Sequence, residues 1–277
     1  MNDKFYDSVL SFGFDSHRIN LWEYQYLLGR DFTVEYLKKC GAFAEGSIIC
    51  EIGSGEGGVT QALALAGAKE VLCTDILEHR LEAGQNMANN FGLNMKYILH
   101  NIMEDDIPKE WLGKFDLVIL RDVIEHLENP ELALKQILLL LKKGGKLYIT
   151  FPPYYSPYGG HQQIVRGNLI SKLPFIHFFP KRIFKALVSS GLDYGIDEVM
   201  RLKDYRLTPR KFKKIAKRLN YSIATQDYFL LRPVFKPRFN LPALKISFLK
   251  AIPGLIDILS LEASFVLSKT DYGNDIK

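Results

Sequence analysis

Two histidines, His126 and His161, follow segments 115–120 and 146–151, whose apolar composition predicts buried β-strands. Imidazole exchanges its proton near neutral pH, so histidine is a common side-chain base for removing a proton from a hydroxyl group. Open α/β sheets bind ligands beyond the carboxyl ends of their strands, where such a base can face a substrate. We therefore predict His161 and His126 as catalytic residues. For His126 the alternative is a structural role, in which the ring hydrogen-bonds a turn.

A glycine-rich turn forms the second candidate site. Residues 51–58 read Glu-Ile-Gly-Ser-Gly-Glu-Gly-Gly and lie between an apolar run and a segment of helix-forming residues. A strand, a glycine turn and a helix in this order present free backbone N–H groups and let a ligand approach the main chain. The spacing fits a dinucleotide site with Asp75 on a ribose, but Glu51 and Gly57 extend it to Glu-x-Gly-x-Gly-x-Gly. A turn without a ligand is disfavoured by the entropic cost of its glycines.

Further segments form the sheet that positions these residues. Residues 70–75 and 95–99 are predicted as the second and third strands, and 132–141 as a helix that ends before two lysines and two glycines. Asp75 ends the second strand, where a carboxylate can accept both hydroxyls of a ribose. Asn101 follows the third strand, and its side-chain oxygen can accept one more hydrogen bond.

In this order the segments resemble the class I S-adenosylmethionine (SAM)-dependent methyltransferases, over about residues 45–153. The resemblance implies an α/β fold with a Rossmann-like seven-stranded sheet, mostly parallel with an antiparallel last strand, helices on both faces, and lid insertions. It implies SAM as cofactor and S-adenosylhomocysteine as product. Asn101 departs from the family pattern, which often has Asp there, against the adenine amino group; Ile102 would cover the ring or belong to the core. The implied cofactor-binding residues are Glu51, Gly53, Ser54, Gly55, Gly57, Asp75, Ile76, Asn101, Ile102 and Arg121.

The resemblance also sets the expected reaction. The sulfonium methyl group is already activated, so most of the rate must come from placing the acceptor on the line of the departing sulfur. An oxygen acceptor also needs its proton removed, which is the role predicted for the two histidines. We predict a SAM-dependent methyltransferase that acts on a small-molecule or lipid-like acceptor, at oxygen. The alternatives are methylation at nitrogen or carbon, and a non-catalytic SAM-fold protein that binds a partner.

No metal site is predicted. The alternative comes from the resemblance, because some quinone O-methyltransferases with a similar segment hold a divalent ion with acids and histidine. The matching residues here are Asp122, Glu125 and His126. Oxygen-rich ligands suit Mg²⁺.

Charge is distributed unevenly along the chain. The net charge is −7 over residues 1–151 and +12 over residues 152–277. Basic surface can attract nucleic acid, anionic lipid or an anionic substrate. The basic helix that Thr208 would cap has a buried stripe including Phe212 and Ala216, which favours a solvated outer face. We therefore expect no nucleic-acid partner.

Cysteine usage and hydropathy bear on the location of the protein. Cys40, Cys50 and Cys73 form no paired pattern, and the last two lie in predicted strands, which suits the reducing cytosol. The first residues lack the pattern of a signal peptide, and no uncharged apolar run of about 18 residues exists. We predict a cytoplasmic protein, with peripheral membrane contact as an alternative. The oligomeric state does not follow from the sequence.

The chain is long enough for one large α/β domain with insertions, and its 47% hydrophobic content supports a full core. Segments 221–231 and 263–268 are predicted as the sixth and seventh strands. Two further segments, 154–207 and 233–261, are insertions relative to this sheet, and both are apolar and basic. They could pack a small core, form a dimer contact, enclose a hydrophobic acceptor or lie in a membrane interface. The expected parts are an N-terminal helical cap (1–44), a SAM-binding core (45–153), a lid for the substrate (154–207) and a C-terminal completion of the sheet (208–277) with an insertion at 233–261.

Overall fold

The computed structural model describes residues 4–10, 16–165, 167, 169–189 and 193–269. A single mixed sheet runs through the described part of the chain, in the order β3-β2-β1-β4-β5-β8-β6-β7. The first five strands are parallel, and β8 is antiparallel to both β5 and β6. The strands are β1 (Ile48–Ile52), β2 (Glu70–Asp75), β3 (Met95–Leu99), β4 (Phe115–Arg121), β5 (Leu141–Phe151), β6 (Tyr221–Leu231), β7 (Leu244–Lys245) and β8 (Glu262–Lys269).

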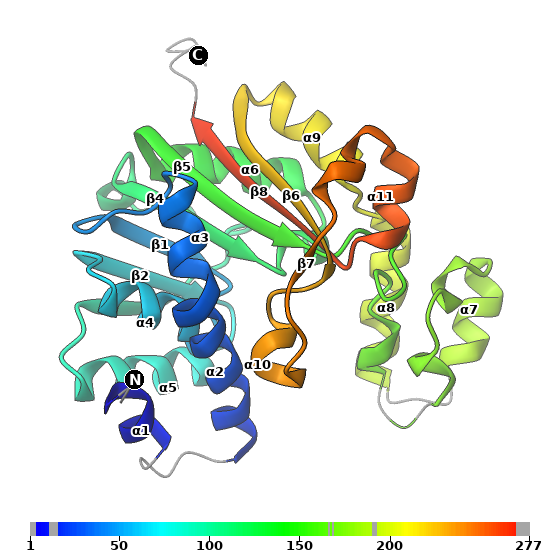
Figure 1. The fold of residues 1–277 in the computed structure, drawn as a ribbon, viewed down its shortest axis with the longest axis horizontal. Helices are drawn as coiled ribbons and strands as arrows, with labels where there is room; N and C mark the ends of the chain where they lie inside the picture. The colour runs from blue at the N-terminus through cyan, green and yellow to red at the C-terminus, as the bar shows by residue number, and fades with distance from the viewer. Residues whose placement is uncertain (1–3, 11–15, 166, 168, 190–192, 270–277) are drawn as a thin grey trace.

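Helices cover both faces of this sheet (Figure 1). The α-helices described are α1 (Lys4–Leu10), α2 (Ser16–Leu28), α3 (Val34–Lys39), α4 (Gly58–Leu65), α5 (Glu78–Asn90), α6 (Pro130–Leu140), α7 (Lys181–Val188), α8 (Asp193–Tyr205), α9 (Pro209–Arg218), α10 (Phe235–Phe239) and α11 (Pro253–Leu259). The predicted fold class is confirmed.

Alternation along the strands divides the core into two layers. On β1, Ile49 packs with side chains of α2, α3, α4 and α5, whereas its neighbour Cys50 packs with those of α6 and α9. Both side chains are almost fully buried, as expected for a parallel strand covered on two faces. Because β1 is parallel to β2 and β4, the carboxyl ends of these strands lie at the same edge of the sheet, between the two helical layers.

Three boundaries differ from the sequence predictions. The sheet has eight strands, because the insertion at 233–261 folds back and adds β7 to the edge of β6; the predicted seventh strand is β8. The helix predicted at 132–141 starts at Pro130, where the Asn129 side chain accepts the Leu132 N–H, and β5 begins directly after it. The two lysines and two glycines expected to form a turn, residues 142–145, lie within β5. A register shift in the pairing of β4 with β5 accommodates them.

The N-terminal helix is interrupted. Within the predicted N-terminal helical cap (1–44), a π-helical turn, Gly29–Thr33, separates α2 from α3. A Cβ atom on Gly29 would approach the Ala62 Cβ to 2.8 Å, so glycine lets this turn pack directly against α4. No helix in the described ranges is both long and apolar enough to cross a membrane.

Helices α7 and α8 form a lobe beyond the carboxyl end of β5 (Figure 1). The lobe has a small core of its own, made of Val165, Ile176, Phe184, Val188, Ile196 and Val199. Helix α8 also reaches the turn after β4, where Glu198 pairs with His126. The lobe is thus attached to the sheet next to the predicted site.

Candidate active site

Backbone geometry at the glycine turn prepares a ligand-binding surface. Gly53, Gly55 and Gly57 have φ angles of 70°, 57° and 75°, a region that side-chain-bearing residues rarely adopt. A Cβ on Gly55 would lie 2.3 Å from Arg80 Nη2, because the Arg80 guanidinium crosses the turn to pair with Glu56. Gly57 caps α4, so the first N–H groups of that helix face the space in front of β1.

Asp75, at the end of β2, is tied to this turn. Its Oδ2 accepts the Gly55 N–H at 2.8 Å, and its Oδ1 accepts the Leu77 N–H at 3.0 Å. The residue is only 7% exposed and lines the cavity in front of the turn. Each carboxylate oxygen has further acceptor capacity, so both can still bind a ribose hydroxyl.

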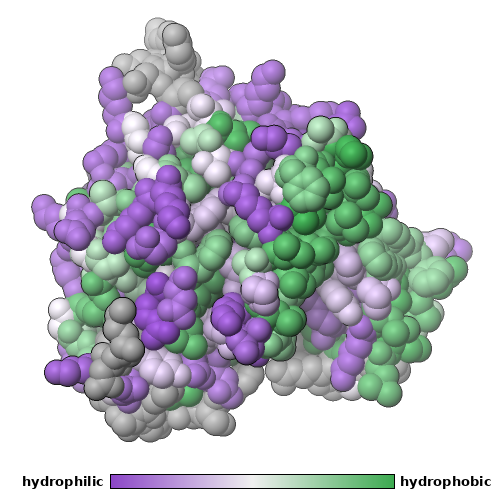
Figure 2. All heavy atoms as spheres, viewed as in Figure 1, coloured by the Kyte–Doolittle hydropathy of each residue, from purple (hydrophilic) through white to green (hydrophobic). Residues whose placement is uncertain are grey.

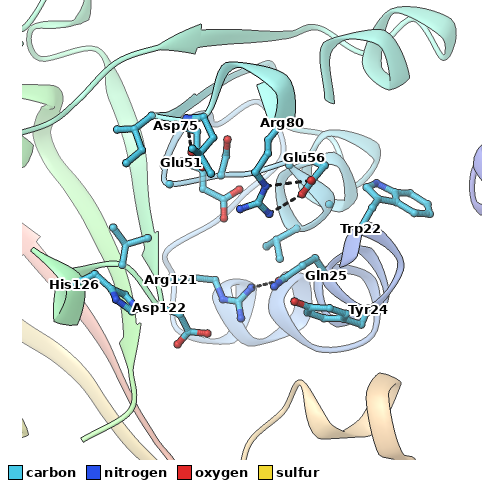
Figure 3. A pocket seen from close by; sticks show the side chains of 18 residues that line it. Trp22, Tyr24, Gln25, Glu51, Glu56, Asp75, Arg80, Arg121, Asp122 and His126 are labelled. Atoms are coloured by element: carbon cyan, nitrogen blue, oxygen red, sulfur yellow. Dashed lines mark hydrogen bonds and ion pairs between the residues drawn. The ribbon is translucent and has the colours of Figure 1, made fainter. Parts of the chain in front are cut away.

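A first cavity of about 400 Å³ lies in front of the turn (Figure 3). Of the predicted cofactor residues it is lined by Glu51, Gly53, Ser54, Gly57, Asp75, Ile76 and Arg121. Gly55 does not line the cavity; the Arg80 guanidinium lies against it.

Acidic and basic groups share this first cavity. Burial raises the pKa of Glu51 to about 7, although the nearby Arg121 guanidinium and the Thr60 hydroxyl favour its ionised form. Thr60 Oγ1 donates to Glu51 Oε2 at 2.9 Å, and Arg121 donates to the Gln25 side chain. A cationic ligand would stabilise the ionised carboxylate of Glu51.

A second cavity of about 390 Å³ joins the first at Gly53 and Asp75. It contains the remaining predicted residues, Asn101 and Ile102. The Asn101 side-chain oxygen accepts the Met103 N–H at 3.0 Å, which leaves one lone pair for a ligand. Ile102 is buried in the main core and also lines the cavity, so both interpretations of this residue fit the structure.

Comparisons with known proteins agree with this geometry. Residues 50–149 match the methyltransferase domain family. A ubiquinone biosynthesis O-methyltransferase of Coxiella burnetii is 29% identical over 158 residues, which cover 53% of this chain and 64% of the relative. The chain carries a class I SAM-dependent methyltransferase domain. It spans less than two thirds of the length of the curated relatives that head this comparison.

Solved structures show the same fold. Magnesium protoporphyrin IX methyltransferase from Synechocystis PCC 6803, solved with bound S-adenosylhomocysteine, aligns with a TM-score of 0.54 at 18% identity, covering 97% of this chain and 96% of that one. A SAM-dependent methyltransferase from Mesorhizobium loti aligns with a TM-score of 0.53 at 16% identity, covering 86% and 99%. These alignments show the shared fold. SAM as the cofactor follows from the class of methyltransferase domain that the chain carries.

The N-terminal helix adds residues to the cofactor cavity that the sequence analysis did not assign. Trp22, Tyr24 and Gln25 of α2 line the first cavity. Trp22 is fully buried and donates to the Gln61 side chain at 2.5 Å. The one-turn spacing of Trp22 and Gln25 on a helix was the available signal, but it does not distinguish a cavity wall from core.

A third cavity, of about 460 Å³, lies on the other side of Asp122. Asp122 lines both this cavity and the first one, and it has a φ angle of 52°. His161 lines the third cavity and has the same φ angle of 52°. Two non-glycine residues in this costly conformation, one on each side of the junction, are typical of a functional site.

Asp122 has a partly buried cationic partner that the sequence analysis missed. Arg232, which follows β6, donates to Asp122 Oδ2 and, at 3.1 Å, to Glu262 Oε2. The arginine holds the pKa of Asp122 below its usual value despite burial. Asp122 Oδ1 has no hydrogen-bond partner among the described residues. No local pattern indicates this contact, because its partners are 110 residues apart.

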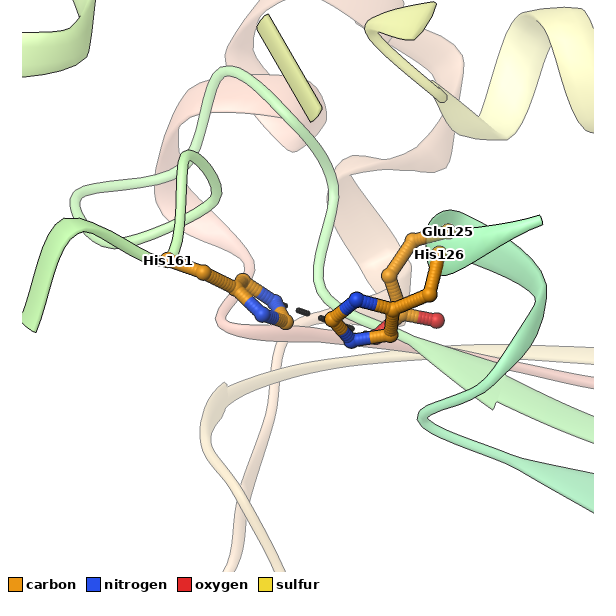
Figure 4. A group of neighbouring side chains, drawn as sticks. All are labelled: Glu125, His126 and His161. Atoms are coloured by element: carbon orange, nitrogen blue, oxygen red, sulfur yellow. Dashed lines mark ion pairs between the residues drawn. The ribbon is translucent and has the colours of Figure 1, made fainter. Parts of the chain in front are cut away.

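The two predicted catalytic histidines lie together (Figure 4). Their ring centroids are 4.8 Å apart, and Glu125 Oε1 is 3.7 Å from His126 Nε2 and 3.8 Å from His161 Nε2. The Glu198 carboxylate on His126 Nδ1 raises the pKa of His126, whereas burial and the neighbouring His126 lower the pKa of His161 to about 3. These shifts favour the charged form of His126 and the neutral form of His161.

Glu125 is buried beside the two rings, and burial raises its pKa to about 8. Neither of its carboxyl oxygens has a hydrogen-bond partner among the described residues. Glu125, His126 and His161 each offer a ligand atom within 4.8 Å of the others, so they are the residues that could hold a divalent ion. His161 joins this set in place of Asp122, which the sequence analysis had named for that alternative.

Proposed function

We propose that this chain transfers the methyl group of SAM to an oxygen of a small-molecule or lipid-like acceptor. The observation that carries the proposal is the junction at Asp122, where the cavity with the predicted cofactor residues meets the cavity that His161 lines. The name of the curated relative, an O-methyltransferase, supports oxygen as the acceptor atom. The predicted cofactor residues, from Glu51 to Arg121, are part of this proposal.

In the reaction, the acceptor oxygen forms a bond to the methyl carbon as the bond from that carbon to sulfur breaks, which leaves S-adenosylhomocysteine. The chain's first contribution is placement, because the turn after β1 and the third cavity hold the two reactants on opposite sides of Asp122. Its second contribution is proton removal. We assign proton removal to His161 because it lines the third cavity; for this role Asp122 and Glu198, which raise its pKa, must offset the burial that holds the pKa at about 3 in the free chain.

Two nearby carboxyl groups support the assignment of His161 as the base. Asp122 and Glu198 favour the charged form of His161 electrostatically, so they would stabilise the imidazolium that proton transfer creates. His126 lines the cofactor cavities, not the acceptor cavity, and its Nδ1 is bound to Glu198. We therefore give His126 a positioning role, holding α8 against the turn after β4, and keep proton removal for His161.

The surface of the two insertions supports a hydrophobic acceptor. Figure 2 shows hydrophobic side chains gathered on the side where Figure 1 places α11. Exposed apolar residues there and on the lobe include Phe178, Phe179, Ile183, Phe239, Leu244, Phe248 and Ile252. Lysines such as Lys181 and Lys250 lie among them, the composition of segments that rest in a membrane interface. We infer peripheral membrane contact, and absence of co-flotation with vesicles of anionic lipid would refute it.

The function is tested by incubating the protein with SAM and a panel of alkyl-substituted phenols, catechols, anilines and carboxylic acids. Mass spectrometry would measure S-adenosylhomocysteine and the methylated product. We expect products methylated at oxygen, and none from the same protein with sinefungin, a SAM analogue that has no methyl group to transfer. Products methylated only at nitrogen or carbon would overturn the oxygen assignment. Binding of S-adenosylhomocysteine without any product would favour the non-catalytic alternative.

A further inference from the structure

The rim of the third cavity carries an excess of positive charge. Three cations, Lys172, Arg232 and Arg238, line this cavity, whereas Asp122 is the one carboxylate among its lining residues. Arg232 is neutralised by Asp122 and Glu262. In the described part of the chain, no carboxylate pairs with Lys172 or Arg238. These two charges are available to a ligand.

The two free cations come from different insertions. Lys172 belongs to the segment that follows β5, and Arg238 to α10, which follows β6. They approach the same cavity from chain segments 66 positions apart in the sequence. An anion at this rim would therefore meet positive charge from two separate segments of the chain.

Arg238 is held in place by aromatic rings. Its guanidinium carbon lies 4.8 Å from the ring centre of Tyr24 and 5.2 Å from that of Phe239. Stacking on rings leaves the edge of a guanidinium free to form paired hydrogen bonds with a carboxylate or phosphate. Tyr24 also lines the cofactor cavity, so Arg238 lies close to the junction of the two sites.

The interior of the cavity supplies apolar and polar contacts. Phe235, Phe239 and Leu261 line its apolar part. Ser156 also lines it, is fully buried, and its hydroxyl has no hydrogen-bond partner among the described residues. A buried polar atom without a partner costs free energy, and a polar group of a ligand would satisfy it.

We propose that the methyl acceptor carries an anionic group, a carboxylate or a phosphate, which Lys172 and Arg238 bind at the rim while the apolar part of the acceptor fills the cavity. This rests on the proposed function, since it takes the third cavity as the acceptor site. It adds a preference for anionic acceptors, which the proposed function does not include. Neutral acceptors of the same size would bind more weakly, because they leave two cations at the rim without a partner.

The test uses binding instead of turnover, so it can fail independently of the proposed function. The probes are 4-phenylbutyrate, 4-phenylbutyl phosphate and the neutral 4-phenylbutanamide, titrated by ligand-observed NMR with and without S-adenosylhomocysteine. We expect the two anions to bind roughly fivefold more tightly than the amide. A preference for the phosphate over the carboxylate, or the reverse, identifies which anion the acceptor carries.

Variants assign the effect to the rim. Arg238→Gln and Lys172→Gln should each bring the anions close to the affinity of the amide, whereas Lys214→Gln, on the exposed face of α9, removes a charge elsewhere and should change nothing. Equal binding of anions and amide by the unaltered protein would overturn the proposal. So would an Arg238→Gln variant that keeps the anion preference but loses affinity for S-adenosylhomocysteine, because Arg238 would then serve the cofactor.

Discussion

The two proposed cofactor cavities and the third cavity, which we propose as the acceptor cavity, are built in different ways. The first two cavities draw mainly on loops after β1, β2, β3 and β4, within about one hundred consecutive residues. Their shape depends on backbone conformation, above all on the positive φ angles of the glycine turn. The acceptor cavity combines the loop after β5 with residues that follow β6, and side chains determine its shape.

This difference explains why the first two cavities can be similar in related proteins while the third cavity differs. A backbone-built site tolerates change in most side chains as long as the glycines and one acid stay in place. A side-chain-built site changes its ligand whenever its lining residues change. The family match at residues 50–149 covers the first kind of site and ends before the segment that contains His161. The family match therefore bears on the cofactor site, and the lining of the third cavity must be argued from this chain.

The largest effect is expected at the acceptor side. His161→Ala should lower kcat by roughly 100-fold or more, which is the usual contribution of a general base. The affinity for SAM, measured by calorimetry, should stay within about twofold, because His161 lines the third cavity and not the first two.

His79→Ala is the matched control for this variant, because His79 is exposed on α5 and lines none of the three cavities. Full activity of His161→Ala would remove His161 from the chemistry. A parallel loss of SAM affinity would show that the two regions are not separable as described.

The next effect is expected at the cofactor side. Asp75→Ala should weaken SAM binding at least tenfold, since it removes an acceptor of ribose hydroxyls as well as the bonds to the Gly55 and Leu77 N–H groups. Each charge-assisted hydrogen bond contributes about 1.5–3 kcal/mol. Calorimetry on Asp75→Ala and on the exposed Asp106→Ala separates this effect from a general change of charge. Unchanged affinity of Asp75→Ala would contradict the ribose assignment.

The same contrast decides how much of the molecule could be predicted. The strands at residues 70–75 and 95–99, the position of Asp75 at a strand end and the cap at Thr208 follow from local patterns, and the structure contains all of them. The missed features depend on contacts between distant segments. Arg232 reaches Asp122 across 110 residues, and β7 forms only because β6 has an open edge.

The two histidines show why residue type alone could not assign their roles. His126 and His161 were predicted from the same signal, a histidine after a strand, yet Glu198 from the lobe binds His126 and raises its pKa. His161 lines the third cavity, and burial lowers its pKa. No local pattern contains the position of Glu198, so the two roles could not be separated before α8 was placed.

The smallest expected effect concerns the proton on Glu51. Burial raises its pKa to about 7, so the folded chain holds this proton more tightly than the unfolded chain, and the contribution of Glu51 to the free energy of unfolding falls as pH rises from about 4.3 to about 7. The sulfonium charge of SAM favours the carboxylate, so binding near pH 6.5 should release part of a proton, and binding near pH 9 should release none from Glu51. Calorimetry in buffers of different ionisation enthalpy measures this number. S-Adenosylhomocysteine has the same amino group without the sulfonium, so the difference between the two ligands isolates Glu51. If Glu51→Gln leaves that difference unchanged, the proton comes from another group, and Glu51 does not face the sulfonium end of the cavity.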